Sequence, residues 1–515
     1  MTRILTPFAI FLIWLAAWPA AAQEAAISSD PLPEMAAIEQ AWNRGDFVTV
    51  RAGLKRLATE TGTPLAQYRY GRILLEGRGG PRDSVAAAEW LEKAVAQNHV
   101  EATTLLARMY LTGYEPGPAA DKARAASLLS DAAARGDAEA QYYLALLYRA
   151  GDGVTQDDTA SFTWMRAAAE KGNVEAQYEL ARVLARGIGT PADPEAAEAW
   201  LREAAGAGHV QAQFFLGQTL RARDKNNREA LDWLRRAAEA GLPVAQRNLG
   251  MAYLTGTGVE ADSKEALRWL NTAADQGDPG AWSSLGYAYA SGTGVERNDE
   301  TAVQWYERAS NSGLGRSTLA LARFYETGRG VAQDMDKAVE LYRAAFDQGE
   351  TAAAERLGTL TIEGALDGKI APQRSLPWVA AAARAGQPEA LEWLQNRADD
   401  MPGAALHLGL IALEGDAADT KAAAAWLEQA AQGGLTEAQF QLGTLYSTGN
   451  GVAQDYVQAH KWFNIAAARG HGGALQTRET LASLMTPEEI AAAQRAARAW
   501  FEISEPRPPE PVEGE

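Results

Sequence analysis

The sequence predicts an all-α protein, a right-handed superhelical α-solenoid of about eleven helical-hairpin repeats. The phrase Ala-Ala-x-x-Gly recurs along the chain, and six of the ten intervals between its closing positions are 36 residues. A large apolar residue stands eight residues before each closing position. One hairpin cannot bury its own apolar face, so a period of this length is typical of hairpins stacked on their neighbours. The closing positions are Asn98, Gly136, Gly172, Gly208, Gly241, Gly277, Gly313, Gly349, Gly386, Gly434 and Gly470.

Each repeat contains the elements of a hairpin, as the unit at 243–278 shows. Its first half has apolar residues at helical spacing around Leu249, followed by Gly250, whose recurrence in other units indicates close approach of two helices. Gly256-Thr257-Gly258-Val259 then predicts a turn. Asp262 stands where it can cap the second helix, and the same offset gives Asp157, Asp193, Asn298, Asp334 and Asp455.

The large residue before each closing position is usually Trp. Since it recurs at one position of the repeat, we expect it to lie in the core between helices rather than in a cofactor site. The members are Trp90, Trp164, Trp200, Trp233, Trp269, Trp305, Trp378, Trp426 and Trp462, with Leu128 and Leu341 in the two remaining units.

The first 22 residues have the order of a secretory signal peptide. Arg3 precedes an apolar run from Ile4 to Trp18, and Ala20–Ala22 supplies the small residues of a cleavage site. This order predicts a mature chain that starts at Gln23, periplasmic or secreted, with no transmembrane segment. An uncleaved anchor is the alternative, because the uncharged run approaches the roughly 20 residues that span a bilayer.

The composition excludes several classes of protein. The chain of 515 residues has a net charge of -18, which argues against nucleic acid as a partner. It contains no Cys, which excludes disulfides and thiol catalysis, and its five His are scattered. We therefore expect no cofactor and no metal.

The repeat motif Ala-Gln-x-x-Leu-Gly-x-x-Tyr-x-x-Gly-x-Gly-Val-x-x-Asp, followed by Ala, Trp and Ala-Ala-x-x-Gly, resembles the Sel-one-like repeat (SLR) family, relatives of tetratricopeptide repeats. The units at 243–278 and 436–471 match nearly every position, and the resemblance covers about 34–500. It implies a hairpin solenoid and an adaptor role, since members of this family act as adaptors for many different complexes.

The departures from this motif predict the domain organisation. The unit that ends at Gly241 is short, with Arg223-Asp224-Lys225-Asn226-Asn227 in place of the glycine turn. The stretch 351–402 lacks the usual turn and cap, places Pro377 at a helix start and adds a half-unit at 388–398, so it is either a hinge or a rigid kink. The predicted parts are a signal peptide (1–22), a linker (23–33), an N-terminal array with its cap (34–350), the irregular repeat (351–402), a C-terminal array with a capping helix that Thr486-Pro487-Glu488-Glu489 starts (403–503), and a disordered tail (504–515).

No motif in the sequence indicates catalysis. The Gly-x-Gly loops repeat and lack the Lys-Ser/Thr of a phosphate loop, which favours turns. His99, His209 and His471 share one position after the closing residue, which favours loop residues over metal ligands, and His407 and His460 have no ligand partner at i+4. We therefore expect a protein that is not an enzyme, and no catalytic or metal-binding residue is assigned.

By resemblance, the first helix of each hairpin lines the concave side, with the residues two before and two after the recurring Leu facing inward. In the N-terminal units these positions are rich in Tyr and Arg, which are enriched in binding hot spots, although Arg at this position also serves as scaffold along the groove. The row Arg72, Arg108 and Arg182 favours a carboxylate-bearing partner. The candidate partner-binding residues are Tyr68, Arg72, Arg108, Tyr142, Tyr178, Arg182, Phe214 and Arg323.

The sequence therefore predicts an exported, non-enzymatic protein-binding scaffold or regulator in the cell envelope, with unidentified protein partners and possible contact with envelope machinery. Two alternatives stay open: an assembly factor for surface polysaccharide export, which family precedent suggests, and a cell-wall-active enzyme.

Overall fold

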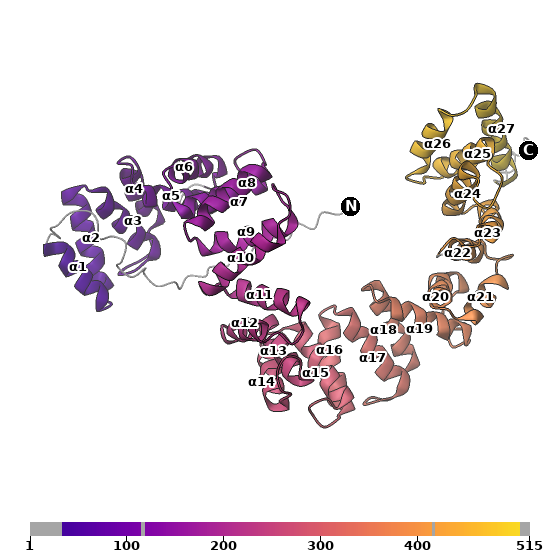
Figure 1. The fold of residues 1–515 in the computed structure, drawn as a ribbon, viewed down its shortest axis with the longest axis horizontal. Helices are drawn as coiled ribbons and strands as arrows, with labels where there is room; N and C mark the ends of the chain where they lie inside the picture. The colour runs from indigo at the N-terminus through magenta and orange to yellow at the C-terminus, as the bar shows by residue number, and fades with distance from the viewer. Residues whose placement is uncertain (1–32, 115–118, 415–417, 505–515) are drawn as a thin grey trace, which may run out of the picture. The chain divides into compact units, whose positions relative to one another are not determined.

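The computed structural model describes residues 33–114, 119–414 and 418–504, and over these residues it contains 27 α-helices and no strand (Figure 1). It divides into two compact units, of which unit 1 ends at Arg223 and unit 2 begins at Asp224. Within each unit successive helices form hairpins, so the predicted all-α solenoid is confirmed. The predicted signal peptide at 1–22, the linker as far as residue 32 and residues 505–515 of the tail lie outside the described residues.

The helices of unit 1 are α1 (Pro33–Asn43), α2 (Phe47–Thr61), α3 (Pro64–Glu76), α4 (Ser84–Val95), α5 (Val100–Thr112), α6 (Lys122–Ala134), α7 (Ala138–Ala150), α8 (Asp158–Glu170), α9 (Val174–Arg186), α10 (Pro194–Gly206) and α11 (Val210–Arg223). The helices of unit 2 are α12 (Arg228–Glu239), α13 (Pro243–Thr255), α14 (Ser263–Asp275), α15 (Pro279–Ser291), α16 (Asp299–Asn311), α17 (Gly315–Thr327), α18 (Met335–Asp347), α19 (Thr351–Ile362), α20 (Pro372–Arg384), α21 (Pro388–Gln395), α22 (Pro402–Ala412), α23 (Thr420–Gln432), α24 (Thr436–Thr448), α25 (Tyr456–Ala468), α26 (Ala474–Ala482) and α27 (Pro487–Ser504).

The sequence signals of the hairpin act as predicted. Asp262 accepts a hydrogen bond from the backbone N–H of Glu265 at the start of α14, and its five equivalents also cap their helices. Gly250 packs so closely on α14 that a Cβ there would lie 2.8 Å from Cγ of Leu270, which explains the glycine inside a helix. In the turn, Gly189 has φ +68°, and a Cβ would lie 2.0 Å from the carbonyl oxygen of Asp158 in the preceding repeat. The turn glycine thus allows the backbone of one hairpin to lie close to the backbone of the preceding one.

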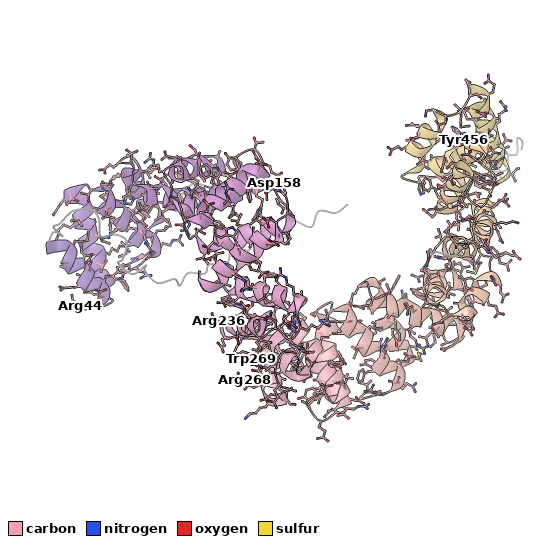
Figure 2. The ribbon with its side chains drawn as sticks, in the orientation of Figure 1. Arg44, Asp158, Arg236, Arg268, Trp269 and Tyr456 are labelled. Carbon is pink, nitrogen blue, oxygen red and sulfur yellow. The ribbon has the colours of Figure 1, made fainter. Side chains whose placement is uncertain are left out.

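The recurring Trp lies at the edge of the core rather than inside it. Trp378 and Trp462 are buried, and the other seven members are half-buried. Of these seven, Trp90, Trp164, Trp200, Trp305 and Trp426 pack against buried clusters, so the row contacts the core as expected but mostly at its boundary. The buried position is the next residue along the second helix, for example Leu270 at 0% exposure. Trp269 lies beside it on α14, with the guanidinium of Arg268 4.5 Å from its ring (Figure 2). The side chain that follows Trp faces the first helix of its own hairpin, whereas Trp lies at the solvent boundary.

The unit boundary falls in the short turn between α11 and α12, inside the repeat at 210–242. The irregular stretch 351–402 lies within unit 2. There α19 and α20 form a hairpin, and α21 is the predicted additional helix. The expectation that Pro377 starts a helix is wrong, because α20 begins at Pro372 and contains Pro377.

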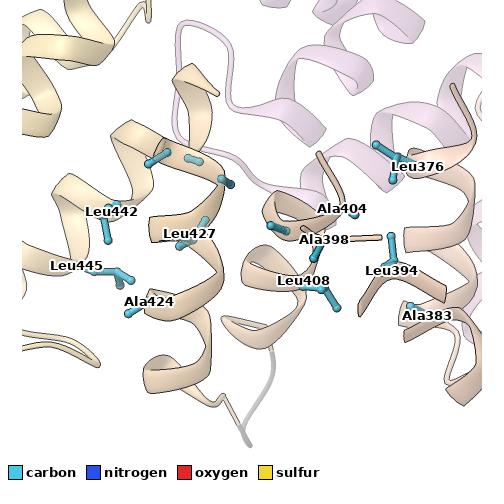
Figure 3. Close-up of a cluster of buried hydrophobic side chains, with 14 of the residues drawn as sticks. Leu376, Ala383, Leu394, Ala398, Ala404, Leu408, Ala424, Leu427, Leu442 and Leu445 are labelled. Carbon is cyan, nitrogen blue, oxygen red and sulfur yellow. The ribbon is translucent and has the colours of Figure 1, made fainter. Parts of the chain in front are cut away.

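The core of unit 2 continues through this stretch. Leu376 and Leu394 belong to the same buried cluster as Leu408, Leu427 and Leu442, which links α20 and α21 to the C-terminal repeats (Figure 3). At the C-terminal end, the backbone N–H of Thr486 donates to Glu489 and that of Glu489 donates to the Thr486 hydroxyl. These two bonds confirm the predicted capping box at the start of α27.

Candidate protein-interaction surface

We call the side chains at the fifth, sixth and ninth positions of α3, α5, α7, α9 and α11 the first-helix face of unit 1. Seven of the eight predicted partner-binding residues belong to it, whereas Arg323 lies exposed on α17 of unit 2. Tyr178 and Phe214 are buried, and Arg182 is exposed. Four members are half-buried, namely Tyr68, Arg72, Arg108 and Tyr142.

The arginines of this face form ion pairs within the protein. Arg72 pairs with Glu76 at 2.8 Å, and Arg182 pairs with Glu179 at 2.6 Å. Arg108 instead reaches Glu139 in the following repeat, at 2.7 Å. Glu76 and Glu179 are largely shielded from solvent, whereas the pair of Arg108 and Glu139 is more exposed and contributes little to stability. In each case a partner carboxylate would have to compete with the internal one. The three arginines of the predicted row are therefore already paired with carboxylates of the protein.

Three aromatic side chains of first helices stack with the histidine that ends their own repeat. His99 stacks on Tyr68, His209 on Tyr178 and His471 on Phe440, with ring centroids 4.8, 4.4 and 4.1 Å apart. These histidines were predicted to be loop residues. They have a more definite role, because each stacks on the first helix of its own repeat and accepts a backbone hydrogen bond that helps to start the helix after it.

The histidine at α11 shows how the ring is oriented. The backbone N–H of Ala212 donates to Nδ1 of His209 at 3.1 Å, and Nε2 lies 3.2 Å from a carboxylate oxygen of Glu175. Since Nδ1 accepts, the proton of the neutral ring is on Nε2 and is donated to Glu175. This hydrogen bond holds the pKa of the Glu175 carboxyl below its usual value.

The tyrosines of this face remain protonated. Burial raises the pKa of Tyr178 and of Tyr142 above the ordinary value, and for Tyr142 the carboxylates of Glu175 and Glu179 act in the same direction. The face thus offers neutral aromatic rings with phenol groups beside guanidiniums.

Sequence reasoning missed three residues of this region: Arg149, Glu179 and Phe215. Arg149 donates to Glu179 at 2.9 Å from the neighbouring helix α7. Phe215 is 45% exposed, and its ring stacks on Tyr178 with centroids 6.1 Å apart. Phe215 directly precedes the recurring Leu216. The sequence pattern assigned only the residues two before and two after this Leu to the inward side, so Phe215 was not among the candidates.

Two further observations on the described residues concern metal binding and membrane spans. Across residues 33–114, 119–414 and 418–504, no three side chains of His, Asp or Glu come together as a metal site. In the same ranges no helix combines the length and the apolar character that crossing a bilayer requires.

Comparison with known proteins identifies the repeat. The Sel1 repeat model matches ten segments that together cover more than half of the chain, and it leaves out residues 351–401. The matched residues are 64–99, 100–137, 138–173, 174–209, 210–242, 243–278, 283–314, 316–350, 402–435 and 436–471. No curated protein matches the chain.

Two solved structures of Sel1-type proteins are similar. The first is c5321, a protective antigen of uropathogenic Escherichia coli strains with an SLR fold. It is 28% identical with a TM-score of 0.58, over 88% of this chain and 94% of that one. A Sel1 repeat protein from Oxalobacter formigenes is 29% identical with a TM-score of 0.45, over 65% of this chain and 95% of that one. Solenoids of this type are generally protein-interaction scaffolds. The chain belongs to the Sel1 repeat family.

Proposed function

We propose that this protein is an exported, non-enzymatic scaffold or regulator of the cell envelope that binds a protein partner through the first-helix face of unit 1. The observation that carries the proposal is the exposed ring of Phe215, stacked on Tyr178 beside the guanidinium of Arg182. Large aromatic side chains and arginines are the residue types that dominate binding energy at protein interfaces.

The form of the face also supports binding. Within unit 1 the rings of Tyr142 and Tyr143 lie 5.4 Å apart on α7, and those of Phe214 and Phe215 lie 5.3 Å apart on α11. The first helices α7, α9 and α11 therefore add aromatic area to one surface, and a solenoid presents that area with little loss of entropy on binding. The remaining predicted residues, Tyr68, Arg72 and Arg108, extend the same surface toward α3 and α5.

Site-specific photocrosslinking tests the binding proposal. A photoreactive phenylalanine analogue replaces Phe215, and in a matched control it replaces Phe346, which is 37% exposed on the second helix α18. In envelope fractions we expect one protein to be captured from position 215 and not from position 346. Equal capture at both positions, or none at 215, would contradict the proposal.

The proposal of export rests on the order of Arg3, the apolar run and Ala20–Ala22. We expect the protein purified from the periplasmic or secreted fraction to begin at Gln23 when its N-terminus is sequenced. Recovery of an intact chain beginning at Met1 in the membrane fraction would replace export with anchoring.

A further inference from the structure

Glu179 lies on the first-helix face, and two arginines share its carboxylate. It is 12% exposed and lies between Nη1 of Arg149, at 2.9 Å, and Nη1 of Arg182, at 2.6 Å. One turn further along α9, Arg186 is exposed and forms no ion pair within the described part of the chain. The other carboxylate here, Glu175, is paired with His209. Three guanidiniums therefore face two carboxylates, which leaves a local excess of positive charge in a chain whose net charge is -18.

This arrangement makes Arg182 available to a partner. If Arg182 turns to an incoming carboxylate, Glu179 keeps its bond to Arg149 and is not left as an unpaired buried charge. Leaving a buried charge unpaired is the costly part of breaking an ion pair, and it is avoided here. Arg182 is itself 42% exposed, so it moves without opening the core.

An exposed aromatic surface lies next to these charges. The guanidinium of Arg182 is 5.7 Å from the ring of Tyr178, which is covered on another side by His209 and by the 45% exposed Phe215. Arg72 also shares its carboxylate, since Glu76 pairs with both Arg72 and Arg78. The ring beside it, Tyr68, stacks with His99 as Tyr178 stacks with His209, but Tyr178 also stacks with the exposed Phe215. Among the candidate arginines of unit 1, Arg182 thus combines a shared counter-ion with an exposed aromatic ring stacked nearby.

We propose that Arg182, Arg186 and Phe215 form a binding site for a partner segment that carries a carboxylate next to an aromatic or large apolar side chain. The guanidiniums receive the carboxylate, and Phe215 with Tyr178 packs against the apolar group. This inference rests on the proposed function and adds the chemistry of the partner to it.

The test uses the full chain and three fluorescein-labelled peptides of equal length. The first contains Asp and Phe separated by Gly and Ser, the second has Asn for Asp, and the third has Ala for Phe. Fluorescence anisotropy measures binding at low and moderate salt. We expect the Asp-Phe peptide to bind more tightly than either substituted peptide by about tenfold, with an affinity that falls as salt rises.

Variants locate the binding. Arg182→Gln with Arg186→Gln should remove the preference for Asp over Asn, and Phe215→Ala should remove the preference for Phe over Ala. The control Arg343→Gln/Phe346→Ala changes an exposed Arg and an exposed Phe on α18 and should leave both preferences intact. Unchanged helical circular dichroism and melting confirm that the variants fold.

The two proposals fail in different ways. Equal binding of the Asp and Asn peptides, or equal effects of the control and the Arg182/Arg186 variant, would overturn the inference about the partner's chemistry. Photocrosslinking at position 215 would still succeed in that case if the face binds protein. Failure of the photocrosslinking overturns the proposed function and this inference with it.

Discussion

At the scale of single residues, each second helix carries two large neighbouring side chains with different roles. Leu270 is fully buried against Gly250 of its own hairpin, whereas Trp269 is half-buried under the guanidinium of Arg268. The sequence predicted that the Trp row lies in the core between helices because large aromatic side chains dominate burial, and the structure places most of the row at the boundary of that core. A shift of one residue on a helix rotates a side chain by about 100°, which is enough to move it from the interior to the boundary.

The first prediction follows from this difference. Leu270→Ala leaves a cavity between α13 and α14 and should lower the free energy of unfolding by about 2–5 kcal/mol. Trp269→Ala should cost less, because part of its ring already contacts water and Arg268 can settle over the gap. Urea unfolding followed by circular dichroism measures both. A larger loss for Trp269→Ala than for Leu270→Ala would restore the Trp row to the core.

A second prediction concerns two histidines of unit 2, of which His460 is buried and His407 is half-buried. Nδ1 of His407 and of His460 has no hydrogen-bond partner among the described residues. Burial lowers the pKa of both rings, and Arg384 and Arg478 respectively act in the same direction. A histidine with a lowered pKa stays neutral in the folded chain while the unfolded chain takes up a proton near pH 6.5. Stability should therefore be constant above about pH 6.5 and fall as the pH drops below it.

The comparison of His407→Leu/His460→Leu with the wild type isolates this effect. At pH 7.5 the difference in melting temperature reports packing alone, because both rings are neutral. At pH 5.5 the wild type should have lost more of its stability than the variant has. Equal losses in the two proteins between these pH values would show that other groups cause the acid sensitivity.

At the scale of helices and turns, most of the fold could be predicted. The capping residues and the turn glycines recur at a fixed offset, so the assignment made in one repeat applies to the others. The extra helix α21 follows from its own local sequence. The division at Arg223 was not predicted, although the sequence shows that the repeat at 210–242, in which it falls, lacks the glycine turn.

The candidate surface was predictable only in part. The register of the first helices fixed which side chains share a face, but not which carboxylate each arginine selects. Arg72 and Arg182 pair within their own helices, whereas Arg108 reaches Glu139 across a repeat of 38 residues, two longer than the common period. Such choices depend on ångström-scale distances between hairpins, which the sequence pattern does not contain.

The third prediction decides between a hinge and a rigid kink at 351–402. Trp378 belongs to the buried cluster of Leu341 and Leu357, while its neighbour Val379 belongs to that of Leu394, so α20 is packed on both sides. We expect amide hydrogen exchange in α19–α22 to be as slow as in α13–α18, which is the behaviour of a rigid kink. Faster exchange throughout α19–α22 would favour the hinge.

At the scale of the whole molecule, the free energy of folding comes from contacts between neighbouring helices along the chain. The buried side chains group into separate clusters, each shared by a few successive helices, rather than into one central core. In such a solenoid the free energy of folding is close to a sum of repeat and nearest-neighbour contributions. Parts of such a solenoid can therefore unfold at different temperatures.

The last prediction tests this with one substitution in each unit. Leu144 in unit 1 and Leu357 in unit 2 are 1% and 0% exposed, and both lie away from the residues proposed to bind a partner. In differential scanning calorimetry we expect two transitions, because each unit has its own buried clusters. Leu144→Ala should lower the temperature of one transition and leave the other in place, and Leu357→Ala should do the reverse. If both substitutions lower one common transition by similar amounts, the units fold as a single cooperative body and the boundary at Arg223 has no energetic meaning.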